Sequence, residues 1–365
     1  MIVRQMAVLM RLCGIFASEM AEMKDIRQLS LEQLTALFVE QGEKPFRARQ
    51  LYEWLWKKSA WSFDHLTNLP LNIREWLAKD FVINAVEISE FQKSNDGTKK
   101  VAFGLHDGNL VEGVLIPTEK RLTACISSQV GCSLSCKFCA TGYLDRKRNL
   151  DASEIYDQVV HIRNICDEEF HKPLTNIVYM GMGEPLLNYS NVLKSVELIT
   201  SDQGLGMAAR RITVSTAGIA GMIRRLGDDE VKFNLALSLH AANDEKRNEI
   251  MGINKTNNLD NLKSALKYYY QKTKNQVTLE YIVFAGFNDS IQDARELFDF
   301  AKQLPSKINI IEYNPIDNAS FKNADLGKME KFSRYLEEKG MNVYLRKSRG
   351  KDIDAACGQL ANKST

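Results

Sequence analysis

The sequence carries almost no net charge, because 48 lysines and arginines nearly balance 46 aspartates and glutamates. A net charge of +2 argues against a protein that coats a polyanion with its whole surface, but it permits a local basic face. The sequence also lacks low-complexity tracts and any period typical of a collagen or a solenoid. Hydrophobic residues make up 44% of the chain, so we expect a globular protein with a packed core.

Long hydrophobic runs are missing as well. The apolar stretch at residues 6–10 is interrupted by Arg11 before it reaches the length of a signal peptide or a membrane span. We therefore expect a cytoplasmic protein that is not attached to a membrane. Met20 and Met23 are alternative starts, and residues 1–23 are predicted to be a leader that is disordered or not native.

Cysteines are few, and their number is odd. Seven thiols in a long chain without an export signal indicate a reducing compartment and a metal-binding or catalytic use, not a disulfide scaffold. The seven are Cys13, Cys125, Cys132, Cys136, Cys139, Cys166 and Cys357.

Residues 24–85 have the pattern of a small helical domain. Ser30 and Gln33 form a capping box at the start of a helix that Gly42 ends, and two further short helices are expected around residues 46–55 and 71–77. Residues 86–120 contain strand-like pieces and are predicted to be a connecting β segment.

From residue 121 to residue 350, short β-branched runs alternate with amphipathic helices. The predicted strands span residues 124–127, 176–180, 211–216, 233–240, 277–284, 308–313 and 342–345. This alternation predicts an α/β fold of parallel βαβ units, and the lack of a Gly-x-Gly-x-x-Gly turn favours a TIM-like barrel over a nucleotide-binding sheet. Functional side chains should then lie at the carboxyl ends of the strands.

Three cysteines follow the first of these strands closely. Cys132, Cys136 and Cys139 have the spacing Cys-x3-Cys-x2-Cys, and Gly131 lets the backbone curl around a compact group. Three thiolates suit a cubane iron–sulfur cluster whose fourth iron stays open to a substrate. The alternatives are a structural zinc site or unrelated buried thiols, but zinc normally requires a fourth ligand at a paired spacing, and no second Cys-x2-Cys follows.

This spacing, with Phe138 between the last two cysteines, resembles the radical S-adenosylmethionine superfamily. The resemblance implies a partial (β/α) barrel and one [4Fe-4S] cluster held by Cys132, Cys136 and Cys139. It also implies that the open iron binds S-adenosylmethionine, whose cleavage gives a 5′-deoxyadenosyl radical. Residues 180–185 resemble the motif that binds the amine of this cofactor. The implied cofactor-binding residues are Gly183, Glu184, Ser215, Ser238, Leu239, His240 and Asn314.

The segments around Cys125 and Cys357 indicate one family within this superfamily. Together they closely resemble the dual-specificity 23S rRNA/tRNA adenine-C2 methyltransferases, and the likeness covers about residues 24–360. It implies that Cys357, in the C-terminal segment 351–365, takes a methyl group from one cofactor molecule. A second cofactor molecule then turns that group into a radical that adds to C2. Cys125 is implied to release the product by forming a transient disulfide with Cys357, and Glu112 to accept the C2 proton.

The resemblance also implies the partners. They are 23S rRNA near the peptidyl-transferase centre, the adenine 3′ of the anticodon in some tRNAs, and an electron donor such as flavodoxin or ferredoxin. The sequence gives no sign of an oligomer interface, so a monomer is expected. Arg346, Lys347 and Arg349 precede Cys357 and are predicted to approach the RNA backbone.

Three alternatives stay open. The related adenine-C8 methyltransferases of the antibiotic-resistance type share the cluster and both extra thiols, although Pro185 after Glu184 favours the C2 family. A zinc-dependent RNA-binding module without catalysis would also use the clustered cysteines. A thiol–disulfide oxidoreductase would use Cys125 and Cys357. Cys13 and Cys166 match no motif, and Cys166 is expected to be a packed hydrophobic residue.

Overall fold

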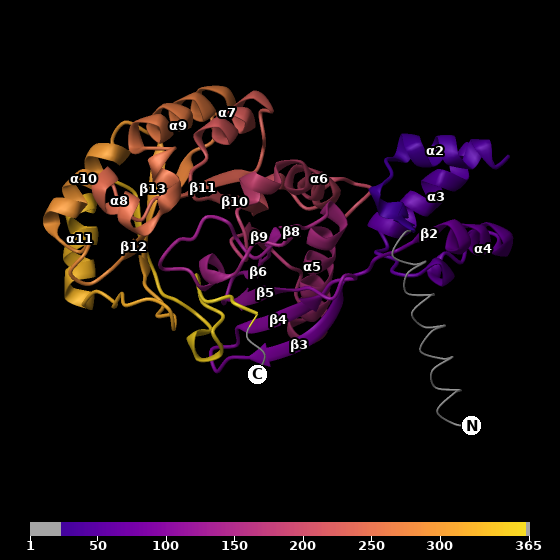
Figure 1. The fold of residues 1–365 in the computed structure, drawn as a ribbon, viewed down its shortest axis with the longest axis horizontal. Helices are drawn as coiled ribbons and strands as arrows, with labels where there is room; N and C mark the ends of the chain where they lie inside the picture. The colour runs from indigo at the N-terminus through magenta and orange to yellow at the C-terminus, as the bar shows by residue number, and fades with distance from the viewer. Residues whose placement is uncertain (1–22, 363–365) are drawn as a thin grey trace. The chain divides into compact units, whose positions relative to one another are not determined.

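The computed structural model describes residues 23–362 (Figure 1). Cys13 and, apart from Met23, the predicted leader lie outside these residues. The chain forms two compact units. One contains the residues up to Ala85 together with Leu198–Gly206, and the other contains Val86–Glu197 and the residues from Met207 onward.

The first unit is helical, as predicted, and is coloured indigo in Figure 1. In the capping box of its first helix, the Gln33 amide donates to Ser30 Oγ at 3.2 Å and the Ser30 amide donates to Gln33 Oε1 at 2.8 Å. Apolar residues of the three α-helices, among them Phe38, Leu51 and Leu77, are fully buried and form its core. Its elements are β1 (Lys24–Asp25), η1 (Ile26–Gln28), α2 (Leu31–Glu40), α3 (Pro45–Trp56), η2 (Phe63–His65), α4 (Leu71–Asp80) and β2 (Phe81–Val82).

The second unit is built on one ten-stranded sheet with the order β14-β13-β12-β11-β10-β9-β6-β5-β4-β3. The strands from β14 to β6 are parallel, and β5, β4 and β3 continue the sheet in antiparallel pairing. Their bounds are β3 (Glu87–Lys93), β4 (Lys99–Gly104), β5 (Leu110–Pro117), β6 (Leu122–Cys125), β9 (Asn176–Tyr179), β10 (Ile212–Thr216), β11 (Asn234–Ser238), β12 (Val277–Val283), β13 (Ser306–Glu312) and β14 (Val343–Arg346).

Helices connect the parallel strands, and Figure 1 shows α7, α9, α10 and α11 along one side of them. The α-helices are α5 (Ala152–Ile165), α6 (Tyr189–Thr200), α7 (Ala220–Asp228), α8 (Asp244–Ile250), α9 (Leu259–Thr273), α10 (Ile291–Ala301) and α11 (Leu326–Glu338). Short helical segments are η3 (Ala140–Tyr143), η4 (Cys166–Phe170), η5 (Pro185–Asn188), η6 (Ala209–Arg211), η7 (Gly252–Lys255) and η8 (Lys351–Ile353). β7 (Gln129–Val130) pairs with β8 (Arg148–Asn149) in a small separate ribbon.

The predicted α/β barrel architecture is confirmed, and each predicted strand from residue 124 onward is present. Within the described residues β14 and β3 form the two edges of the sheet, so the barrel is partial and open. All seven residues of β12 are buried, which explains why five of them are apolar or aromatic. In residues 23–362 no helix combines the length and the apolar character that a membrane crossing requires.

An aromatic cluster lies beneath the loop that carries the three spaced cysteines. Phe284 is fully buried, and its ring centroid lies 5.8 Å from that of Phe138, 5.1 Å from that of Tyr313 and 4.7 Å from that of Phe321. Burying a side chain of this size contributes about 1.5–3 kcal/mol. The cysteine loop is therefore packed against the ends of β12 and β13.

Candidate active site

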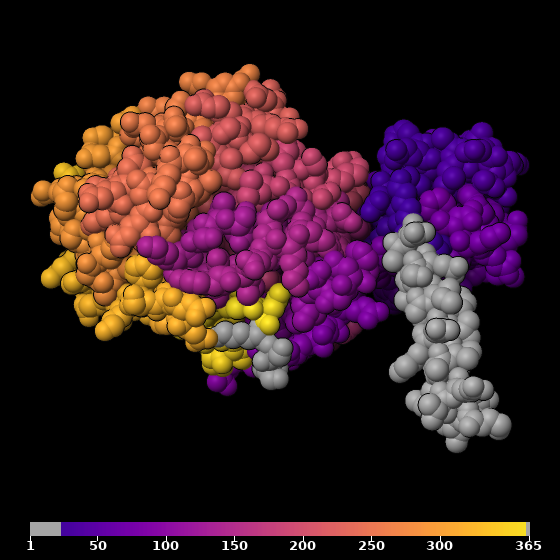
Figure 2. Space-filling view, in the orientation of Figure 1, coloured from indigo at the N-terminus to yellow at the C-terminus, as the bar shows by residue number. Residues whose placement is uncertain are grey.

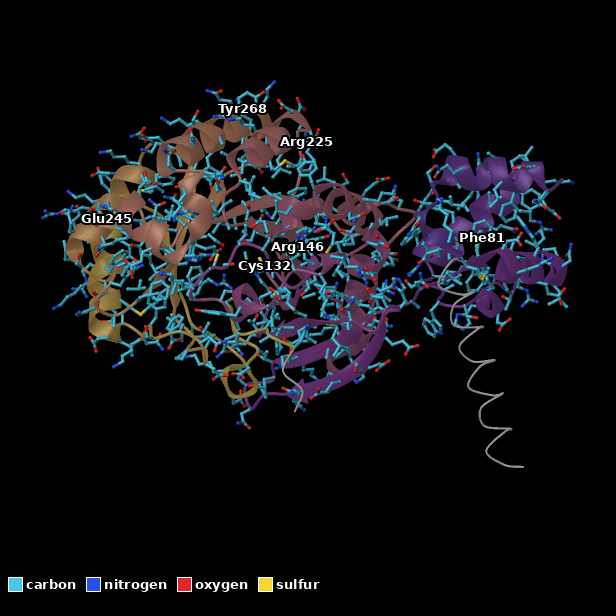
Figure 3. All side chains as sticks on the ribbon, in the orientation of Figure 1. Phe81, Cys132, Arg146, Arg225, Glu245 and Tyr268 are labelled. Carbon is cyan, nitrogen blue, oxygen red and sulfur yellow. The ribbon has the colours of Figure 1, made fainter. Side chains whose placement is uncertain are left out.

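The cysteine loop runs from β7 to β8, and the pairing of these strands closes it at its base. Within it, the Cys139 amide donates to the Cys136 carbonyl at 3.2 Å, and the Gly142 amide donates to the Cys139 carbonyl at 2.9 Å. A Cβ atom at Gly142 would lie 2.7 Å from the Cys136 carbonyl oxygen, so this tight turn requires glycine. Cys132 and Arg146, at opposite ends of the loop, lie close together in Figure 3.

Burial governs the protonation of the three thiols. It raises the pKa of Cys132 to about 11, and it raises the pKa values of Cys136 and Cys139 above their ordinary range. The neighbouring thiols raise the pKa of Cys136 further, because thiolates repel one another. Within residues 23–362, no group of three His, Cys, Asp or Glu side chains could hold a metal ion as the side chains stand. All three cysteines nevertheless line one cavity.

This cavity lies at the carboxyl ends of the parallel strands, where the barrel fold predicts a site. The predicted residues that line it are Cys132, Cys136, Cys139, Gly183, Glu184, Ser215, Ser238, His240 and Cys357. Four other predicted residues do not line it, namely Glu112, Cys125, Leu239 and Asn314.

Glu184 is buried at the start of η5, in the segment that follows β9. Its Oε1 accepts from the Leu186 amide at 3.1 Å, and its Oε2 accepts from the Ala217 amide at 2.7 Å. Burial raises the pKa of this carboxyl group, so a cation beside it would favour the ionised form. Gly183 has φ of +94°, and a Cβ atom there would lie 2.5 Å from Gln129 Cβ. The backbone can turn towards the cavity here because this residue is glycine.

Polar groups from β10 and β11 face the same cavity. The hydroxyl oxygens of Ser215 and Ser238 lie 3.4 Å apart. His240 has φ of +54°, and its Nδ1 accepts from the Ile282 amide at 3.1 Å, which places the ring proton on Nε2. Burial, together with the positive charge of Arg247, lowers the pKa of His240 to about 3. A neutral imidazole therefore lines the cavity as a hydrogen-bond donor.

Leu239 and Asn314 are placed differently. The Leu239 side chain is fully buried, and the residue contributes its amide, which donates to the Glu280 carbonyl at 2.9 Å. The Asn314 side chain donates from Nδ2 to the Cys357 carbonyl at 3.2 Å. Its Oδ1 is buried without a hydrogen-bond partner among the residues described here, so it can still accept from a bound group.

The fold brings Cys125 and Cys357 together from distant parts of the sequence. Cys125 ends β6 and is 7% exposed, and burial together with the nearby Cys357 raises its pKa to about 12. Cys357 is exposed on the C-terminal segment, which Figure 2 shows in yellow at the surface of the large unit.

Glu112 lies on β5 and is 2% exposed. Its Oε2 accepts from the Ala361 amide at 2.8 Å and the Asn362 amide at 3.1 Å, and its Oε1 lies 3.4 Å from Lys100 Nζ. The carboxylate therefore holds the end of the described C-terminal segment.

Glu280 was not predicted as a site residue, but it lines the cavity and accepts from Arg346 Nη1 at 3.3 Å. The available signal was a carboxylate in the mostly apolar run of residues 277–284. Arg346 pairs with Glu280 at the cavity, and its side chain is 39% exposed, so its contact with the RNA backbone stays a prediction. Arg349 donates to the Asp96 carbonyl at 3.3 Å, while Lys347 stays exposed.

Comparison with known proteins identifies the family. Residues 126–301 match the Radical SAM superfamily, and residues 24–83 match the ribosomal RNA large subunit methyltransferase N-terminal domain. Proteins named probable dual-specificity RNA methyltransferase RlmN are similar over nearly the whole chain. The one from Cytophaga hutchinsonii is 63% identical over 93% of both chains, and the one from Salinibacter ruber is 43% identical over 93% of this chain and 94% of that one.

A solved structure agrees with these relatives. The crystal structure of a radical SAM methyltransferase from Sphaerobacter thermophilus has a TM-score of 0.87 and 37% identity, and it covers 92% of this chain and 99% of that chain. The chain therefore belongs to the radical SAM superfamily and, within it, to the family of proteins named dual-specificity RNA methyltransferase RlmN.

Proposed function

We propose that this protein is a radical S-adenosylmethionine RNA methyltransferase that methylates C2 of adenine, with Cys357 as the methyl carrier. The observation that carries this proposal is the cavity, which exposes Cys357 to the same space as Cys132, Cys136 and Cys139 and has Cys125 beside it. Family membership supports this function over a zinc-dependent RNA-binding module and over a thiol–disulfide oxidoreductase.

Cys132, Cys136 and Cys139 are proposed to hold a [4Fe-4S] cluster. The donor set fits this group, because three neighbouring, half-buried thiols with raised pKa values become thiolates readily only beside a strong positive charge, which iron provides. When bound, the cluster supplies the electron that cleaves S-adenosylmethionine. The loop contributes the three thiolates, and the packing of Phe138 keeps them at the floor of the cavity.

The cofactor is proposed to bind along the ends of β9, β10 and β11. The Glu184 carboxylate would accept from the amine of the cofactor, since a cation offsets the cost of its burial. Ser215, Ser238 and the Nε2–H of His240 would hold its polar groups. Gly183 would let the cofactor approach the backbone closely, and Leu239 would contact the cofactor through its backbone. Asn314 would accept a hydrogen bond from the cofactor at its unpartnered Oδ1.

The two thiols outside the loop are proposed to work in sequence. Cys357 would accept a methyl group from one cofactor molecule, which leaves as S-adenosylhomocysteine. The 5′-deoxyadenosyl radical from a second cofactor molecule would take one hydrogen atom from this S-methyl group, and the remaining carbon would join C2 of the adenine. The adduct would then give up one electron, to the oxidised iron–sulfur cluster, and the C2 proton. Cys125 then attacks the Cys357 sulfur, so that a sulfur–sulfur bond forms and the carbon–sulfur bond to the nucleotide breaks. The electron pair of the broken bond goes to the released carbon, which takes up a proton. A reductant must return the disulfide to two thiols, and each turnover uses two cofactor molecules.

Glu112 is proposed to accept the C2 proton. Its Oε2 accepts from the amides of Ala361 and Asn362, so release of the end of the C-terminal segment would free this oxygen to take a proton. Proton acceptance at Glu112 is thereby tied to movement of the segment that carries Cys357.

The proposed substrates are 23S rRNA near the peptidyl-transferase centre and the adenine 3′ of the anticodon in some tRNAs. An adenine in folded RNA has to be unstacked before its C2 can reach Cys357. We also propose flavodoxin or ferredoxin as the electron donor, a cytoplasmic location and a monomeric state.

An anaerobic assay tests this function. The reconstituted protein is incubated with S-adenosylmethionine, a reductant and a 23S rRNA fragment, and the nucleosides are analysed by mass spectrometry. We expect 2-methyladenosine and about four irons per chain, the number in a cubane cluster. Cys132→Ala is the inactive control. Only 8-methyladenosine would instead assign the adenine-C8 activity, and a colourless zinc protein without methylation would refute the proposal.

A further inference from the structure

The segment that carries Cys357 is hydrogen-bonded to the turn between β3 and β4, which lies more than 250 residues earlier in the sequence. Ser94 Oγ donates to Asp352 Oδ1 at 2.6 Å, and the Asn95 amide donates to Asp352 Oδ2 at 3.0 Å. In the opposite direction, the Gly350 amide donates to Asp96 Oδ2 at 3.0 Å, and Arg349 Nη1 donates to the Asp96 carbonyl at 3.3 Å. The turn and the segment therefore hold each other through both side chains and backbone.

The two surfaces also fit sterically. Gly350 has φ of +67°, and a Cβ atom there would lie 2.8 Å from Thr98 Cγ2 and 2.8 Å from Ala355 Cβ. Thr98 is fully buried, and the Ala355 amide donates to the Gly350 carbonyl at 2.9 Å. The segment thus folds back on Gly350 directly against the turn, and Cys357 follows two residues after Ala355.

Other contacts hold the segment beyond Asp352. The Ala140 amide donates to the Gly358 carbonyl at 2.7 Å, and Thr141 Oγ1 donates to the Leu360 carbonyl at 2.6 Å. Glu112 accepts from two amides further on. The Glu112 contacts would have to break for its Oε2 to take a proton, whereas nothing in the proposed reaction requires the contacts at the β3–β4 turn to break.

We propose that the β3–β4 turn is the fixed anchor of the Cys357 segment, with Ser94 and Asp96 as positioning residues for the methyl-carrying thiol. This inference rests on the proposed role of Cys357. That thiol must meet a methyl donor, an adenine and Cys125 in turn. A chain anchored at Asp352 can carry residue 357 at most about 17 Å, since an extended chain spans about 3.3–3.6 Å per residue. The anchor therefore limits how far Cys357 can move from the cavity that it lines while the rest of the segment moves.

The test compares two aspartates that cap neighbouring hairpin turns in the same way. Asp96 Oδ1 accepts from the Thr98 amide at 2.9 Å, and Asp107 Oδ1 accepts from the Asn109 amide at 3.1 Å. Of these two side chains, only that of Asp96 is hydrogen-bonded to the C-terminal segment in the described structure. The variants are Asp96→Ala and its control Asp107→Ala, both as reconstituted holoenzyme. Gly350→Ala disturbs the same contact from the opposite side.

The first measurement is hydrogen–deuterium exchange of residues 349–358, and the second is methylation of the rRNA fragment. Asp96→Ala and Gly350→Ala should accelerate exchange in this segment and lower kcat about ten- to a hundredfold, with the KM for RNA and the iron content unchanged. The fraction of Cys357 found as S-methylcysteine should fall in both variants. Asp107→Ala should leave the exchange rate of residues 349–358 at its wild-type value. Because Asp107 Oδ2 also pairs with Arg148 of β8 at 2.6 Å, Lys194→Ala on α6 serves as the control for kcat and for the S-methylcysteine fraction, and it should leave both at their wild-type values.

Two results would overturn the inference. Unchanged exchange in both Asp96→Ala and Gly350→Ala would show that the turn is no anchor, and faster exchange with unchanged kcat would show that the anchor does not position the thiol. Full methylation by Cys357→Ala would instead refute the proposed function, and the exchange measurement reports on the anchor independently of that result.

Discussion

At the scale of residues, the two thiols outside the cysteine loop have opposite surroundings. Cys125 is 7% exposed at the end of a strand, whereas Cys357 is exposed on a surface segment. An exposed thiol can reach a bulky RNA substrate, and a buried one is shielded from other electrophiles until its partner arrives. The surroundings therefore support separate roles for the carrier and the resolving thiol.

Replacing each thiol separately tests this division. Cys125→Ala, produced with substrate RNA present, should accumulate RNA covalently bound to the protein, because no nucleophile releases the adduct from Cys357. Cys357→Ala should give none. Denaturing gels with labelled RNA measure the adduct, and Cys166→Ala, which removes a buried thiol of α5–η4, serves as the control. Trapping by both variants, or by neither, would contradict these roles.

The same thiol predicts a pH dependence. Burial raises the pKa of Cys125 to about 12, so the attacking thiolate is scarce at neutral pH, and its fraction grows about tenfold per pH unit below the pKa. Release of the adduct in the wild-type protein should therefore accelerate from pH 7 to pH 9. Rapid-quench gels give the release rate, and adduct formation by Cys125→Ala gives the earlier steps. A release rate that is flat over this range would argue against Cys125 as the attacking group.

At the scale of elements, the aromatic cluster joins the cysteine loop to the ends of β12 and β13. Phe284 contacts Phe138 of the loop, and both are buried. This contact explains how a loop that contains one short helical turn, η3, keeps three thiols in place. Gly142 also helps to hold the thiols in place, because the absence of a side chain allows the backbone to pass close to Cys136 in a tight turn.

Removing the central ring should therefore weaken both the fold and the loop. Phe284→Ala is expected to lower the free energy of unfolding by about 3–5 kcal/mol, because it leaves a cavity in a packed core. Urea unfolding of the anaerobic protein, with iron content measured in parallel, checks this. Leu326→Ala, at a side chain that is 66% exposed, should change the unfolding free energy by less than about 0.5 kcal/mol. Equal effects of the two substitutions would disprove the packing role.

At the scale of the whole molecule, a net charge of +2 leaves RNA binding to local basic groups. Lys347 is exposed just before the Cys357 segment, whereas Arg346 and Arg349 are engaged by Glu280 and the Asp96 carbonyl. Of these three basic residues, Lys347 is therefore the one we expect to meet a phosphate near the cavity.

RNA binding should weaken with salt, and Lys347→Ala should reduce the slope of log K against log salt by about 0.7–0.9, the value for one phosphate contact. Filter binding or fluorescence titration of the rRNA fragment at several salt concentrations measures the slope. Lys194→Ala on α6, where the lysine pairs with Glu197, is the control and should leave it unchanged. An unchanged slope in Lys347→Ala would place RNA elsewhere on the surface.

The sequence by itself determined the local features of this protein. The spacing of Cys132, Cys136 and Cys139, the capping box at Ser30 and the alternation of strands and helices depend on residues close together in the chain, so each could be predicted. The strand Glu87–Lys93 was not distinguished, because five of its seven residues are exposed and its pattern is weak.

Only the tertiary structure decided which distant groups meet. The engagement of Glu112 by the C-terminal segment, the pairing of Glu280 with Arg346 and the anchoring of Asp352 by the β3–β4 turn each join residues far apart in sequence. No local pattern encodes such contacts, because they depend on the order of strands in the sheet and on where each strand ends.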